Sequence, residues 1–288
     1  MDQLWTLQPS LILSLHQLLL HPVYYKQQSG EYTLMTNHAE LLMVGMSAKT
    51  FRIGNRVVKV CNVLPEDPAI TQQNLACCET EALVYRILEE HPRIARCHSS
   101  NPPLGLIELE FYPNGNIKAY LERKDSKTPE ADKKRWGIQM IESISYLHSK
   151  GVRHGDLRLE QWLLDDEQSV RLSDFNGSGF DAQPTLALKE RPALGLECSS
   201  HWLPRPNAVD SSEQTDLFAL GSSLYELVVG EKPFAGIDDQ TIETRYEQAI
   251  FPNTEGLLFG REISKCWHQE FENSKELLNA VTNTLSRK

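Results

Sequence analysis

The sequence lacks the patterns that mark several large classes of protein. Its six cysteines show no C-x-x-C spacing and no regular framework, so neither a zinc site nor a disulfide scaffold is indicated. Basic charge is also scarce, because 29 Lys and Arg face 39 Asp and Glu and the net charge is −10. A surface of that sign argues against nucleic-acid binding. We therefore expect reduced thiols in an intracellular protein, cytoplasmic or nuclear.

Long hydrophobic runs are absent as well. The most apolar stretch, residues 11–20, is ten residues long, contains His16 and Gln17, and is too short to span a bilayer. Asp2 is the only charged side chain before it, so the basic start of a secretory signal is missing. We expect this run to pack on the body of the protein as a helix or strand, with no membrane partner.

The remaining composition predicts a globular chain of mixed structure. With 288 residues and 40% hydrophobic content, the chain can bury the core of one large domain or of two lobes. Short β-like runs at 41–44, 50–53 and 56–63 predict a small antiparallel sheet. A helix is predicted over 71–90, a strand over 106–112, and a long helix around 136–147.

Two acids, Asp156 and Asp174, stand on short turns 18 residues apart, each beside an apolar run. A β-hairpin between them would bring both carboxylates into one site. One carboxylate would then accept a proton from a hydroxyl nucleophile while the other holds a divalent metal on a phosphate.

These acids stand in segments that resemble known motifs. Residues 154–164 (HGDLRLEQWLL) and 173–176 (SDFN) are similar to the catalytic loop H-R-D-L-x-x-x-N and the D-F-G turn of protein kinases. Gly155 replaces the Arg, Gln161 the Asn and Asn176 the Gly. Residues 146–153 (YLHSKGVR), 215–227 (TDLFALGSSLYEL) and 229–234 (VGEKPF) extend the resemblance, which covers about residues 40 to 282.

The resemblance implies an α+β, two-lobed protein kinase-like fold. It places a small antiparallel β-sheet with one helix in an N-lobe at about 38–112 and a larger, mainly α-helical C-lobe at about 113–288. Residues 1–37 are then an N-terminal extension without recognisable chemistry.

In the N-lobe, the resemblance assigns Lys59 to the ATP phosphates and Glu81 as its helix partner, with Glu79 as the alternative. The phosphate-covering loop is reduced, because only Gly45 survives from the glycine pattern, with Ser47 a small neighbour. The hinge that binds adenine falls on Leu109, Glu110, Phe111 and Tyr112. An ordinary strand and turn is the competing interpretation for the hinge, and surface residues are the competing one for Lys59 and Glu81.

In the C-lobe, the resemblance makes Asp156 the base that orients the acceptor hydroxyl and takes its proton. Asp174 and Gln161 are expected to hold Mg²⁺, more weakly at Gln161 than at an Asn. Arg158 falls where serine/threonine kinases carry a Lys that stabilises the transferred phosphoryl group. Asn176 tolerates the left-handed backbone that a glycine provides. Asp216 is expected to bond the backbone of the catalytic loop.

Three departures bear on regulation. Without an Arg at Gly155, activity is not expected to depend on a phosphate in the activation segment, for example at Thr185, Ser199 or Ser200. Arg205 reverses the charge of the glutamate that closes this segment in the family. Cys198 stands where serine/threonine kinases commonly place a Thr.

The sequence therefore predicts an ATP- and Mg²⁺-dependent protein kinase that phosphorylates Ser or Thr in a protein substrate. A pseudokinase acting as a scaffold or allosteric partner stays open because the glycine loop and several motifs are altered. The H-G-D sequence at residues 154–156 also suggests a small-molecule phosphotransferase similar to the aminoglycoside phosphotransferases. The substrate, the regulator and the oligomeric state are left open.

Overall fold

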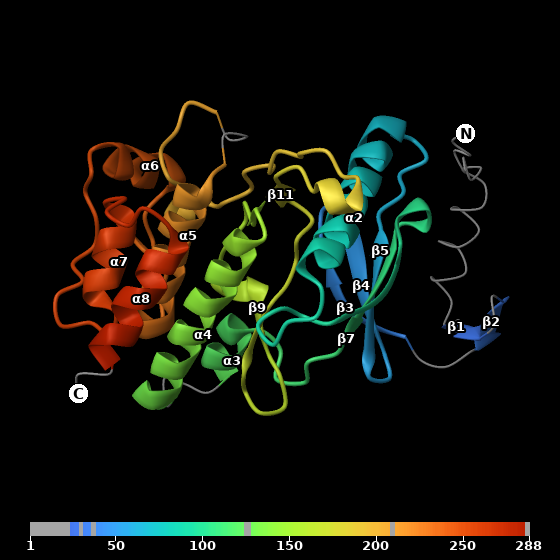
Figure 1. Cartoon of the computed structure of the whole chain (residues 1–288), viewed down its shortest axis with the longest axis horizontal. Helices are drawn as coiled ribbons and strands as arrows, with labels where there is room; N and C mark the ends of the chain where they lie inside the picture. Colours follow the sequence, from blue (N-terminus) through green and yellow to red (C-terminus); the bar gives the residue numbers. More distant parts are fainter. Residues whose placement is uncertain (1–23, 29–30, 36–38, 124–127, 208–210, 286–288) are drawn as a thin grey trace. The chain divides into compact units, whose positions relative to one another are not determined.

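The computed structural model describes residues 24–28, 31–35, 39–123, 128–207 and 211–285. The chain divides into two compact units. The first unit runs to Tyr85 and takes up Arg96–Phe111, and the second contains Arg86–Ala95 and the chain from Tyr112 onward. Figure 1 labels the elements of both units.

The first unit is built on a five-stranded antiparallel sheet with the strand order β3-β4-β5-β7-β6. Its strands are β3 (Glu40–Val44), β4 (Ala48–Ile53), β5 (Arg56–Cys61), β6 (Cys97–Asn101) and β7 (Leu106–Glu110). Helix α2 (Pro68–Leu88) belongs to this unit as far as Tyr85 and lies across the sheet in Figure 1. The core consists of apolar side chains from both, among them Val60, Ile107, Ala82 and Val84.

A separate hairpin precedes this sheet. Strand β1 (Tyr24–Gln28) pairs antiparallel with β2 (Glu31–Met35) as a two-stranded sheet. No strand was predicted within this N-terminal extension. The apolar run 11–20, expected to pack on the body of the protein, lies outside the described residues.

The second unit is mainly helical. Its helices are α3 (Ile117–Arg123), α4 (Glu130–Ser149), α5 (Glu213–Val229), α6 (Asp239–Glu247), α7 (Gly260–Trp267) and α8 (Ser274–Leu285). Most of the predicted apolar face of α4 is fully buried, namely Trp136, Met140, Ile141, Ile144 and Leu147, and Gly151, at φ +68°, follows the end of this helix. Helices α5 and α7 approach closely at Gly221, where a Cβ would come within 2.8 Å of the Cys266 Cβ.

Two short antiparallel ribbons accompany these helices. The predicted hairpin between the two acids is present as β9 (Trp162–Leu164) paired with β10 (Val170–Leu172). Strand β8 (Val152–Arg153) pairs with β11 (Gly179–Phe180). Single 3-10 turns occur at Pro102–Leu104, Leu159–Gln161, Pro184–Leu186 and Ser199–His201. The predicted α+β architecture, a small sheet with one helix and a mainly helical unit, is thus confirmed.

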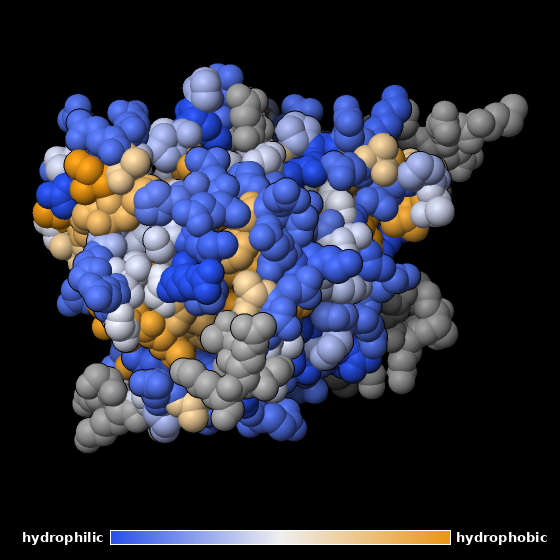
Figure 2. Space-filling view, turned by 60° about the vertical axis from the view of Figure 1, so that its left-hand side comes forward, coloured by the Kyte–Doolittle hydropathy of each residue, from blue (hydrophilic) through white to orange (hydrophobic). Residues whose placement is uncertain are grey.

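The visible surface is mostly polar. The face drawn in Figure 2 is largely hydrophilic, with hydrophobic colour in separate areas. In the described part of the chain, no helix combines the length and the apolar character needed to cross a bilayer. All six cysteines are free thiols.

Candidate active site

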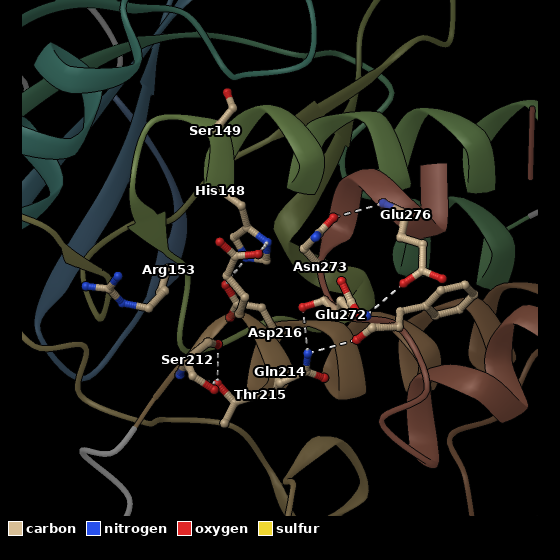
Figure 3. Close-up of polar contacts among 12 residues, drawn as sticks. His148, Ser149, Arg153, Ser212, Gln214, Thr215, Asp216, Glu272, Asn273 and Glu276 are labelled. Carbon is tan, nitrogen blue, oxygen red and sulfur yellow. Dashed lines mark hydrogen bonds and ion pairs between the residues drawn. The ribbon is translucent and has the colours of Figure 1, made fainter. Parts of the chain in front are cut away.

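A buried aspartate at the start of α5 anchors the loop that carries Asp156. One carboxylate oxygen of Asp216 accepts a hydrogen bond from the His154 amide at 2.8 Å and lies 2.9 Å from His148 Nε2. The other accepts from the Gly155 amide at 3.0 Å. Figure 3 shows His148, in the last turn of α4, pointing at Asp216. Burial alone would raise the pKa of Asp216, but the bond and charge of His148, the charge of His154 and the bond from the Gly155 amide together outweigh it and hold the pKa below its usual range. The predicted contact with the loop backbone is confirmed.

The carboxylate of Asp156 is buried and held from two sides. Arg158 Nη1 lies 3.2 Å from Oδ1, and Gln161 Nε2 donates to Oδ2 at 3.1 Å. The same Gln161 nitrogen lies 3.2 Å from the Asp156 carbonyl oxygen. Burial raises the pKa of Asp156 to about 7, although the Arg158 guanidinium opposes this shift. A carboxyl with such a pKa is partly ionised at neutral pH, as a general base requires.

Asp174 is positioned by bonds between the end of β10 and the same loop. The amide and the hydroxyl of Ser173 both donate to the Gln161 carbonyl oxygen at 2.9 Å. The fully buried Phe175 packs with its ring centroid 5.4 Å from that of His154. The Asp174 carboxylate also contributes to the raised pKa of Asp156, so the hairpin brings the two acids together as predicted.

The backbone of this turn differs from the expectation. The left-handed residue is Asp174, at φ +67°, and Asn176 is not among the residues with positive φ. The tolerance of Asn for that conformation is therefore not what permits the substitution. A left-handed non-glycine residue is uncommon and such residues cluster at functional sites.

The donors next to Asp156 fit a metal ion that is shared with phosphate. The Gln161 amide nitrogen donates to Asp156, so its carbonyl oxygen is not used in that bond, and Asp174 carries a carboxylate. Mg²⁺ typically takes one or two protein carboxylates and completes its shell with water and phosphate oxygens. Across the described ranges, no group of three or more His, Cys, Asp and Glu side chains forms a metal site by itself.

The structure gives a steric reason for the glycine at position 155. Its φ of +73° disfavours a side chain, and a Cβ would lie 3.0 Å from the Ala193 Cβ and 3.2 Å from the Gly177 carbonyl oxygen. The segment that fills this space, residues 193–196, is held in place by backbone hydrogen bonds. The Leu196 amide donates to the Gly155 carbonyl at 2.7 Å and the Leu194 amide to the Gly177 carbonyl at 2.8 Å.

The end of this segment contains an ion pair that the sequence did not predict. Arg205 Nη2 lies 2.7 Å from Glu197 Oε2, with side-chain exposures of 7% and 1%. Burial raises the pKa of Glu197, and the bond and charge of Arg205 oppose that shift. The reversed charge at 205 thus has an acidic partner eight residues earlier. Nearby, Cys198 Sγ lies 3.4 Å from both Ser200 Oγ and His201 Nδ1.

In the first unit, the predicted contact between Lys59 and Glu81 is present. Lys59 Nζ, on β5, lies 2.6 Å from Glu81 Oε2, on α2, and their side chains are 10% and 2% exposed. The alternative, Glu79, is exposed. Because two charges are costly to bury, a pair of this kind is weak evidence for stability. The catalytic role of the pair stays a prediction.

Gly45 and Ser47 lie in a tight turn between β3 and β4. The Gly45 amide donates to the Ala48 carbonyl at 2.9 Å. The side chain of Asn62 donates to the carbonyls of Gly45 and Met46 at 2.9 and 2.8 Å. No pattern in the sequence predicted this role of Asn62. One amide of the predicted phosphate loop is therefore already committed to the turn.

The predicted hinge residues occupy the end of β7 and the chain beyond it. Leu109 is buried in the first unit. The Glu110 carboxylate lies 2.6 Å from His98 Nε2 and 3.1 Å from Arg56 Nη1, so its side chain is engaged at the sheet. Tyr112 is buried in the second unit, where its carbonyl accepts from Gly115 at 3.0 Å. The role of these residues in adenine binding stays a prediction.

Comparison with known proteins bears on this arrangement. The family profile described as the protein kinase domain matches residues 52–288. A probable serine/threonine-protein kinase of Dictyostelium discoideum is 30% identical over 190 residues, which cover 62% of this chain and 20% of the relative. A serine/threonine/tyrosine-protein kinase of Arabidopsis thaliana is 26% identical over 210 residues, 69% of this chain and 52% of the relative.

A third relative is a CBL-interacting protein kinase of Oryza sativa subsp. japonica, 30% identical over 171 residues, 57% of this chain and 36% of the relative. The alignments thus span between a fifth and about half of the length of these relatives. The family match begins within β4, after the turn at Gly45.

Proposed function

Since this chain belongs to the protein kinase family, we propose that it is an ATP-dependent kinase that transfers the γ-phosphoryl group to a Ser or Thr hydroxyl of a protein. The preference for Ser or Thr rests on Arg158, which takes the place of the family's Lys, and on the similarity to the probable serine/threonine-protein kinase of Dictyostelium discoideum.

The closed ion pair between Lys59 and Glu81 carries this proposal. Protein kinases need the pair in place for activity, because the lysine contacts the ATP phosphates only when the helix glutamate orients it. Here the two charges meet at 2.6 Å in a nearly buried environment. Their desolvation is costly, which favours a functional reason for keeping them.

The residues of the second unit have distinct proposed tasks. Asp156 orients the acceptor hydroxyl and takes its proton onto the carboxylate. Arg158, 3.2 Å from that carboxylate, neutralises charge on the transferred phosphoryl group. Gln161 fixes the rotamer of Asp156 through its amide nitrogen.

Protein kinase domains use ATP and a divalent metal ion, and we propose Mg²⁺ for this chain, held by Asp174 and the Gln161 carbonyl oxygen. When bound, the metal neutralises negative charge on the phosphates. Adenine would be bound by backbone groups of Glu110 and Tyr112, with Leu109 at the back.

A second candidate is a kinase-like scaffold without phosphoryl transfer. The turn at Gly45 favours it, because the Gly45 amide is occupied and the wider glycine pattern is missing. Phosphate binding by this turn is then weaker than in a glycine-rich loop.

Phosphate transfer tests the first candidate. Purified chain incubated with MgATP and a generic protein substrate should transfer phosphate, and Asp156→Asn should lower the rate by about 10²- to 10⁴-fold through the loss of the base. Asp166→Asn, an exposed acid on the neighbouring hairpin, is the matched control and should keep the rate. Equal transfer by the wild type and Asp156→Asn would remove Asp156 as the base.

Thermal unfolding with and without MgATP separates the two candidates. A ligand at a hundred times its dissociation constant stabilises the fold by about 2.7 kcal/mol. The wild type should gain stability from MgATP, and Lys59→Met should gain less. No gain by the wild type at millimolar MgATP would favour the scaffold.

A further inference from the structure

Strand β3 presents an unusual surface for an edge strand. It is at one end of the sheet and pairs with β4 alone in the described part of the chain. Four consecutive side chains are apolar and exposed: Leu41 at 53%, Leu42 at 43%, Met43 at 52% and Val44 at 62%. The pairing with β4 is irregular between Leu41 and Met43, but beyond this point Met43 and Val44 are regularly paired neighbours and point to opposite faces, so both faces of β3 are apolar.

Natural proteins rarely leave such an edge bare. An exposed, apolar edge strand is a template for pairing with another chain, and proteins normally cover it or place charges on it. Within β3, Glu40 is the only charged residue. We therefore expect an apolar, uncharged segment to cover strand β3.

The same chain contains a segment of that chemistry. Residues 11–20 (LILSLHQLLL) contain seven Leu or Ile residues and no Asp, Glu, Lys or Arg. They form the most apolar run of the sequence. The net charge of −10 opposes the alternative use of this run at an anionic membrane surface.

The β1–β2 hairpin shortens the connection between residues 11–20 and strand β3. If the twenty residues 21–40 were fully extended, they would span up to about 70 Å. Strand pairing, however, sets Tyr24 opposite Met35, so the chain leaves the hairpin about 5 Å from where it entered. The connection that remains is residues 21–23 and 36–39, which reach roughly 30 Å. A tether of this length gives an effective concentration in the millimolar range.

We propose that residues 11–20 dock on the exposed strand β3 of the same chain and cover Leu41, Leu42, Met43 and Val44. The contact is intramolecular and hydrophobic. It is independent of phosphoryl transfer, because it rests on a surface outside the residues assigned to that reaction.

Photo-cross-linking in the full chain tests the contact. Met43→benzoylphenylalanine places the probe on β3, and equal amounts of ¹⁴N- and ¹⁵N-labelled chain are mixed at low micromolar concentration. Mass spectrometry should find the probe joined to a peptide that contains residues 11–20, with both halves of the product carrying the same isotope. Products of mixed isotope would mean that a second copy covers β3 and would overturn the proposal.

Two variants and one second probe site sharpen the result. Leu15→Asp combined with Leu18→Asp should lower the cross-link by about tenfold, since charges are costly in an apolar contact. Ser14→Asp adds a charge at a polar position of the run and should lower it less. A probe at Ile70, exposed to 43% on α2 of the same unit, should cross-link to residues 11–20 in lower yield than the probe at Met43. Equal yields from Met43 and Ile70, or no product with residues 11–20, would refute the docking.

Discussion

The loop around Asp156 in the second unit and the turn around Gly45 in the first unit are anchored differently. The loop is tied to the core by Asp216, which accepts three hydrogen bonds while being almost fully buried. The turn is closed by one backbone bond and the side chain of Asn62, and its Met46 is 88% exposed. Buried, mutually bonded groups are expensive to move, whereas an exposed turn opens at little cost.

This difference indicates that the loop around Asp156 is held more precisely than the turn around Gly45. Phosphoryl transfer depends on exact placement of the base and of charge, and these groups lie on the firmly held loop. The turn at Gly45, which we propose to cover the nucleotide, is held by fewer contacts. If the chain is an active kinase, we expect its proton-transfer chemistry to be conventional and its nucleotide affinity to be modest.

The largest expected effect concerns the anchoring of the activation segment. Arg205→Met leaves the Glu197 carboxylate buried without its cation, which typically costs about 3–5 kcal/mol of unfolding free energy. Adding Glu197→Gln should restore part of this loss because the buried charge is gone. Urea denaturation measures both, with the exposed Arg261→Met as the control. A loss below about 1 kcal/mol for Arg205→Met would show that the pair does not anchor the segment.

The next effect is the pH dependence set by the loop. Asp156 must be ionised to accept a proton, and burial raises its pKa to about 7, with Asp174 and Glu197 adding to the shift. The transfer rate should therefore rise about tenfold from pH 6 to pH 8. Arg158 lowers this pKa, so Arg158→Ala should move the midpoint to higher pH.

Arg135→Ala is the control for that shift, because this arginine bonds Asp132 on the surface of α4. Its pH profile should match that of the wild type. A midpoint for Arg158→Ala at or below the wild-type value would contradict the assigned coupling.

A smaller effect would test the turn in the first unit. Ser47→Gly removes a side chain from the turn and lets the backbone approach a phosphate, which we expect to add one hydrogen bond of about 1 kcal/mol. The affinity for MgATP, measured by calorimetry, should improve about fivefold. Asn55→Gly makes the same change in the β4–β5 turn and should leave the affinity unchanged. If both variants bind like the wild type, the turn at Gly45 has no part in phosphate binding.

The smallest effect is expected from charge in the activation segment. No cation stands at Gly155, and backbone bonds already order the neighbouring residues, so a phosphate has little to add. Thr185→Glu should change the transfer rate by less than about twofold, as should Ser199→Glu, since each lacks the usual arginine partner. Ser200→Glu is interpretable only if the variant folds, because Ser200 is buried. A tenfold activation by any of the three, with Thr185→Gln unchanged, would refute this prediction.

Much of the architecture could be predicted from local patterns. The apolar period of α4 gave its buried face, and the β-like runs gave β3, β4 and β5 because alternation and turn residues are encoded within a few positions. The pairing of Lys59 with Glu81 was predictable from motif spacing. The β1–β2 hairpin was missed because its polar residues do not alternate clearly with apolar ones.

The parts of the site that could not be predicted depend on distant segments. Asn62 clamps a turn 16 residues before it, and Glu197 meets Arg205 because the chain folds back between them. No motif in the adjacent sequence indicates that Asn62 or Glu197 makes these contacts. Only packing decides which polar groups are buried together and must bond one another.

The loop around Asp156 shows most clearly which properties follow from the sequence and which follow from the tertiary structure. The sequence by itself determined that the chain belongs with the protein kinases, that two acids flank a hairpin, and that Gly155 and Gln161 replace the usual residues. The tertiary structure decided what these replacements do, because Ala193 and Gly177 leave no space for a side chain at 155 and the longer amide of Gln161 reaches the carboxylate of Asp156. Motif letters encode which groups are present, whereas three-dimensional packing fixes the distances at which those groups act.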